Sequence, residues 1–115
     1  MLTLLSAITV GAGLAAAAPP PLTPPQAEAL RCGVAFALVS RMQGAGGKGA
    51  PGWPAMGARG REYFVRVTAR LMEDTGASRD TIAALASREV PALQAAGALD
   101  AARPGCLPLL DASGL

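Results

Sequence analysis

The two cysteines, Cys32 and Cys106, are the residues of this chain best suited to covalent chemistry. A widely separated pair forms a structural disulfide when the protein matures in an oxidising compartment. The alternative is a pair of unrelated buried thiols, because both cysteines lie among apolar residues. The export pattern of the N-terminal segment favours the bond, and we predict a disulfide between Cys32 and Cys106.

Catalytic groups are scarce in this sequence. The chain contains no histidine, which removes the usual general base at neutral pH, the Ser-His and Cys-His nucleophile systems and most zinc sites. Its one lysine, Lys48, stands in a glycine-rich stretch, and Glu73 and Asp74 would point about 100° apart on a helix. No phosphate loop, dinucleotide fingerprint or calcium loop is present. We therefore expect no enzymatic activity, no cofactor and no metal site.

The segment 44–60 holds the best candidates for recognition of a partner, since seven of its 17 residues are glycine and one is Trp53. Aromatic and arginine side chains are enriched among interface hot spots, so we predict that Trp53, Arg59 and Arg61 bind a protein partner. Lys48, Arg59 and Arg61 are also candidates for an anion site at the start of the following helix. The alternatives are that Trp53 pins the segment onto the bundle and that the arginines are solvated at a frayed helix end.

Residues 70–89 resemble the helix-turn-helix of bacterial regulators. A helix, a turn at Gly76 and a second helix capped by Ser78 follow one another in the order of that motif. The motif has a small residue four positions before the turn glycine, where this chain has Met72. We expect Met72 to be a packing residue and the segment to be an ordinary helical corner, with DNA binding as the alternative.

The N-terminal segment has the pattern of an export signal. An apolar run over 2–14 is followed by small residues at 15–18, and the first charged residue is Glu28. We predict a signal peptide over 1–17, cut after Ala16 or Ala17, and an extended leader over 18–22. The apolar run is short for a bilayer span, although an uncleaved membrane anchor is the alternative.

Residues 23–115 are expected to form a single helical domain. Thr23 as N-cap, Pro24 at the first helical position and Gln26 for a capping box predict a helix over 24–43. That helix is apolar almost all round, so we expect it to be central and buried, with its small residues, among them Gly33, facing a close neighbour. A flexible loop over 44–60 then leads to a second helix over 61–74.

The last part of the domain carries three prolines. The third helix, beginning after Ser78 and ending at Gly97, must kink or break near Val90 because Pro91 follows, and the kink would turn Glu89 to solvent. A turn at 104–105 and a short apolar segment over 106–110 close the chain. The predicted fold is all-α, with three principal helices, a glycine-rich loop and a short C-terminal segment tied back by a disulfide.

This layout is similar to that of acid-stress chaperones and toxin-immunity proteins, which are small, exported, helical and disulfide-bonded. We expect a periplasmic or secreted, non-enzymatic protein that binds a protein or peptide. Nucleic acid is not an expected partner, and contact with a membrane would come only through an uncleaved N-terminal segment.

Overall fold

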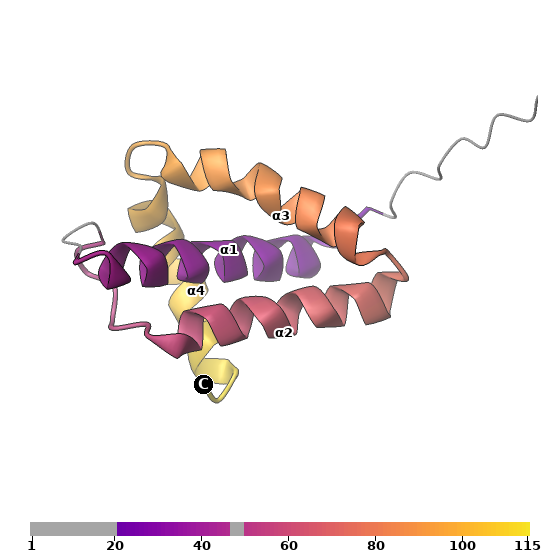
Figure 1. Cartoon of the computed structure of the whole chain (residues 1–115), viewed down its shortest axis with the longest axis horizontal. Coiled ribbons are helices and arrows are strands. Elements are labelled where there is room, and N and C mark those ends of the chain that lie inside the picture. The colour runs from indigo at the N-terminus through magenta and orange to yellow at the C-terminus, as the bar shows by residue number, and fades with distance from the viewer. Residues whose placement is uncertain (1–20, 47–49) are drawn as a thin grey trace, which may run out of the picture.

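The computed structural model describes residues 21–46 and 50–115, and its described part is all-α. The helices are α1 (Pro24–Gly44), α2 (Ala58–Thr75), α3 (Arg79–Gln94) and α4 (Ala98–Ala112). In Figure 1, α1 lies in the middle, α2 and α3 lie on opposite sides of it, and α4 crosses it. The predicted signal peptide over 1–17, most of the leader and Lys48 lie outside the described residues.

Helix α1 is the central element, as the sequence predicts. The Thr23 side chain accepts a hydrogen bond from the Gln26 backbone N–H, the Gln26 side chain accepts one from the Thr23 N–H, and Pro24 opens the helix. A continuous run from Cys32 to Phe36 is buried, so several faces of the helix are covered. Each of the other three helices contacts α1, which makes it the core around which the bundle assembles.

Helix α2 packs along α1 through two glycines. A Cβ on Gly33 would meet the Cα of Phe64 at 3.5 Å, whereas a Cβ on Gly60 would lie 2.6 Å from the carbonyl oxygen of Phe36. The small face of α1 therefore receives α2, as expected. Helix α2 begins at Ala58, three residues earlier than predicted, because the Arg59 N–H bonds to the Met56 carbonyl and starts the first turn.

The turn between α2 and α3 follows the sequence signals. Gly76 adopts the left-handed conformation, with φ of 71°, and its N–H bonds to the Met72 carbonyl at 3.0 Å. Ser78 caps α3 by accepting a hydrogen bond from the Thr81 N–H at 3.2 Å. Met72 is half-buried and packs against the core, so its predicted packing role is confirmed.

Of the predicted kink or break of the third helix, the break is wrong, because α3 continues through Pro91 to Gln94. Proline removes one helical hydrogen bond, but Ile82, Ala86 and Leu93 are buried on one face and hold the helix across that gap. Glu89 is half-buried beside this face. Gly97 does not end the helix: it has φ of 75° and precedes α4.

The C-terminal region is a full helix, which corrects the predicted turn at 104–105 and short segment over 106–110. Helix α4 has 15 residues and contains both Pro104 and Pro108. Two prolines lower its intrinsic helical stability, yet Cys106 and Leu110 are buried against the bundle, and this packing overrides local propensity. The described fold therefore has four helices.

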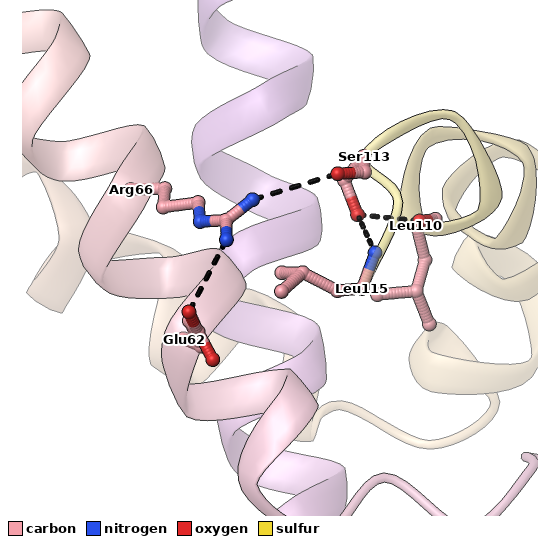
Figure 2. Close-up of polar contacts among 5 residues, drawn as sticks. All are labelled: Glu62, Arg66, Leu110, Ser113 and Leu115. Atoms are coloured by element: carbon pink, nitrogen blue, oxygen red, sulfur yellow. Dashed lines mark hydrogen bonds and ion pairs between the residues drawn. The ribbon is translucent and has the colours of Figure 1, made fainter.

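A disulfide joins Cys32 of α1 to Cys106 of α4, as predicted, with 5.2 Å between the two Cα atoms. Both cysteines are almost completely buried. A second, polar link lies at the end of α4, where the Arg66 guanidinium donates to the Ser113 carbonyl and pairs with Glu62 at 3.2 Å (Figure 2). Helix α4 is thus attached to α1 covalently and to α2 by a hydrogen bond.

Candidate functional site

An open, mainly apolar cleft lies at the end of the bundle where α1 finishes and α3 passes into α4. Its volume is about 630 Å³. Residues from all of these elements and from the segment before α2 line it: Leu38, Arg41, Met42, Ala45, Ala50, Pro51, Trp53, Leu93, Gln94, Ala95, Ala96, Gly97, Leu99 and Asp100. Clefts of this size and composition are typical of ligand and peptide sites.

Few charged side chains surround the cleft. Arg41 and Asp100 are its two charged lining residues, both exposed, and Asp100 is paired with the Arg103 guanidinium at 3.1 Å. The aliphatic walls come from Leu38 and Met42 on α1 and from Leu93 and Leu99 on either side of the α3–α4 turn. The cleft is therefore suited to an uncharged, apolar occupant.

Trp53 forms part of the cleft lining and is anchored in the core. Its side chain is only 7% exposed and meets Phe36 edge to face, with ring centroids 6.0 Å apart. Phe36 in turn packs edge to face on Tyr63 at 4.9 Å. Trp53 thus pins its segment onto the bundle, which is the structural alternative that the sequence left open.

The indole Nε1 of Trp53 is buried, and no described residue accepts a hydrogen bond from it. A buried donor without an acceptor costs about 1–3 kcal/mol. A buried polar atom of this kind is uncommon and calls for an explanation. It is the one buried side-chain nitrogen or oxygen without a partner in the part of the chain that the structure describes.

Side chains from α1 and α4 hold residues 50–57, which we call the strap. Gln43 acts as a clamp, because its amide donates to the Pro54 carbonyl and accepts from the Met56 N–H, both at 2.9 Å. Arg103 donates to the Pro51 carbonyl at 3.1 Å, and its guanidinium occupies the space that a Cβ on Gly52 would need. These contacts fix the position of Trp53 in the cleft wall.

The last turn of α3, next to the same cleft, has backbone carbonyls to which no described residue donates. Helices α1, α2 and α4 each end with a backbone N–H bonded back to a carbonyl of the last turn, whereas Ala95 after α3 is extended and makes no such bond. Among the described residues, none donates to the carbonyls of Ala92, Leu93 or Gln94. Two of these three residues line the cleft.

The residues predicted to bind a partner or an anion are not brought together. Trp53 lines the cleft, but Arg59 and Arg61 lie in the first turn of α2 and do not. Arg59 is half-buried and Arg61 is exposed. Gly57 caps α2 without a side-chain hydrogen bond, and its carbonyl accepts from Ser40 at 2.6 Å. The recognition role of these arginines stays a prediction.

A second groove, of about 510 Å³, runs between α1 and α4 over the disulfide. Its floor is made of small residues, with Glu28 and Arg31 at its side. Nearby, burial and then the negative charge of Glu28 raise the pKa of Tyr63 above its usual value of 10.0. The phenol is therefore neutral under ordinary conditions and serves as a core residue.

The segment that resembles a helix-turn-helix has a different setting here. Helix α2 packs chiefly on α1, and α2 and α3 run in opposite directions on either side of it (Figure 1). The corner between them is therefore part of a bundle that surrounds α1. None of the helices in the described ranges 21–46 and 50–115 is long and apolar enough to cross a membrane.

Comparison with protein-family models, with curated proteins and with solved structures finds no match for this chain.

The cleft itself was not found by sequence reasoning, because it needs the start of α4. Leu99 and Asp100 were expected to lie in the stretch before a turn at 104–105. No helix was therefore expected to place them in the wall of a cleft. The helical spacing of Leu99, Ala102, Cys106 and Leu110 is the signal that would have indicated α4.

Proposed function

We propose that this chain is an exported, non-enzymatic protein that binds a protein or peptide partner in the cleft beside Trp53. The observation that carries the proposal is the cleft, whose walls are mainly apolar and whose lining includes a Trp with an N–H that no described residue accepts. Aromatic residues in such settings are typical anchors of protein interfaces.

The disulfide supports action in an oxidising compartment, and we propose the periplasm or the exterior of the cell. The apolar run over 2–14 and the small residues after it support a cleaved signal peptide. The sequence, without histidine and with its one lysine in a glycine-rich stretch, supports a binding role rather than catalysis.

Site-directed photocrosslinking in the native host tests the cleft. A photoreactive residue at Ala96, which is exposed and lines the cleft, should crosslink to a partner, whereas one at Ala84, exposed on α3 away from it, should not. Adding Ala95→Phe, which fills the cleft, should abolish the Ala96 crosslink, and Ala84→Phe should leave it intact.

Mass spectrometry of the purified native protein tests export at the same time. A mature start at Ala17 or Ala18 is expected. A protein that keeps Met1 and is found in the cytoplasm would contradict the proposal.

Loss of the partner in Arg59→Ala with Arg61→Ala, but not in Ala95→Phe, would place the binding surface at the start of α2 instead.

A further inference from the structure

We infer that the cleft binds an extended, uncharged peptide segment with aliphatic side chains, and that the peptide backbone bonds to both Trp53 and the end of α3. The inference rests on the proposed function and names the class of its partner. It follows from a buried donor on Trp53 and from helix-end carbonyls of α3 that have no described partner, on residues that line one apolar cleft or lie next to it.

The donor is the Nε1 of Trp53. The side chain is more than nine-tenths buried and forms part of the cleft lining, and no described residue accepts from this nitrogen. Because the atom is shielded from water, the ring has to move slightly before a ligand carbonyl reaches it. The free energy lost by leaving this donor unpaired is regained when the carbonyl is in place.

The acceptors are the carbonyls of Ala92, Leu93 and Gln94 in the last turn of α3. The first unpaired carbonyls at the end of a helix are normally satisfied by a cap, by water or by a ligand. Here the chain leaves the helix in an extended conformation at Ala95 and provides no cap. Gln94 and Ala95 are exposed, so a ligand can approach this end of α3 from solvent.

An extended peptide matches both sets of groups and the apolar walls. Its backbone offers one N–H and one C=O at every residue, and successive residues are about 3.3 Å apart along the chain. A lipid tail or another hydrocarbon would fill the walls but would leave the Trp53 donor unpaired. The walls are aliphatic, and Asp100 at the rim is already paired with Arg103, which favours a peptide with aliphatic side chains over a strongly charged one.

The single tryptophan allows a direct test, because the protein has one indole N–H signal in a proton–nitrogen NMR spectrum. The probe is the blocked peptide acetyl-Ser-Leu-Val-Leu-Ser-amide, added to the full mature protein with its disulfide intact. Binding should move the indole signal downfield, as expected when this N–H gains an acceptor. A control peptide with methylated nitrogens on its three central residues should bind roughly tenfold more weakly, because it cannot donate to α3.

Two matched variants locate the effect. Ala95→Phe should weaken binding at least about tenfold by filling the cleft, and Ala84→Phe should leave the affinity unchanged. An indole signal that does not move at saturating peptide would overturn the inference. So would equal affinity for the methylated peptide, or equal loss in both variants.

The two proposals can fail separately. One outcome is that a folded partner crosslinks from Ala96 while the indole signal does not move when the peptide is added. That outcome would overturn the peptide inference and leave the proposed function standing. Peptide binding in the test tube without any crosslink from Ala96 in cells would overturn the proposed function and leave the affinity for peptide standing.

Discussion

Replacing Gly60 by alanine should destabilise the protein, although alanine is the better helix former. An added Cβ would lie 2.6 Å from the Phe36 carbonyl oxygen and 3.1 Å from its carbon, both of which are backbone atoms of the buried central helix. Neither atom can move without shifting α1 relative to α2. Overpacking of this kind costs about 1–3 kcal/mol, and we expect a loss near the middle of that range.

Gly33 provides the matched control, since it lies on the other side of the same helix pair. A Cβ there would meet Phe64 and Tyr63 at 3.5–3.7 Å, which is ordinary van der Waals contact. Gly33 is in the interior of α1, so Gly33→Ala should gain about 0.5–1 kcal/mol from the lower backbone entropy of the unfolded chain. The two substitutions are chemically identical, and we expect them to change the free energy of unfolding in opposite directions.

Urea unfolding followed by circular dichroism measures both free energies. With about 4–8 °C per kcal/mol for a domain of this size, Gly60→Ala should lower the melting temperature by roughly 10 °C and Gly33→Ala should raise it by several degrees. If Gly60→Ala is neutral or stabilising, the close approach of α2 to the Phe36 carbonyl is not a feature of the protein in solution. If both variants are equally destabilised, the distinction between the two contacts is wrong.

Three further predictions concern the disulfide, the buried tyrosine and the strap. A Cys32→Ala, Cys106→Ala double variant should lose about 4.5 kcal/mol, because a bond over a sequence separation of 74 residues restricts the unfolded chain by that amount on the loop-entropy model, and an unchanged melting temperature would contradict this. Since burial and Glu28 raise the pKa of Tyr63 above 10.0, tyrosinate absorbance of the folded protein should appear only above that pH. The unfolded chain loses this proton at lower pH than the folded one, so the free energy of unfolding should hold below pH 10 and fall as the pH rises further. A titration midpoint of the absorbance at or below pH 10 would refute the burial of Tyr63. Gln43→Ala should cost about 1–3 kcal/mol and shift Trp53 fluorescence to the red by releasing the strap, whereas Gln94→Ala, exposed at the cleft, should do neither.

Local signals in the sequence account for the first three helices. Thr23, Pro24, Gly76 and Ser78 fix helix ends by hydrogen bonds or backbone conformations that involve only near neighbours, so they were identified without knowing the fold. The burial of α1 on several faces followed from its composition. The disulfide followed from the number of cysteines and the export pattern.

The errors have a common physical cause. Pro91 indicates a kink or break and Pro104 a turn when each segment is considered alone, and packing in the bundle outweighs that local preference in the folded chain. The cleft was missed because it depends on α1, the strap, α3 and α4 meeting. The Gln43 clamp was missed because a single glutamine carries no periodic signal. The position of Trp53 was left open by the sequence, since its glycine-rich surroundings are compatible with either pinning or exposure.

The two prolines of α4 bear on the order in which the molecule matures. Because Pro104 and Pro108 each remove a helical hydrogen bond, α4 gains its stability from the surface that α1 and α3 offer it, and it should become helical only once that surface exists. In the proposed exported chain, Cys32 would emerge 74 residues before Cys106 and would have to remain a thiol in the meantime. Because the bond joins α1 to a helix that forms on the assembled bundle, we expect oxidation to be the closing step of folding rather than its guide.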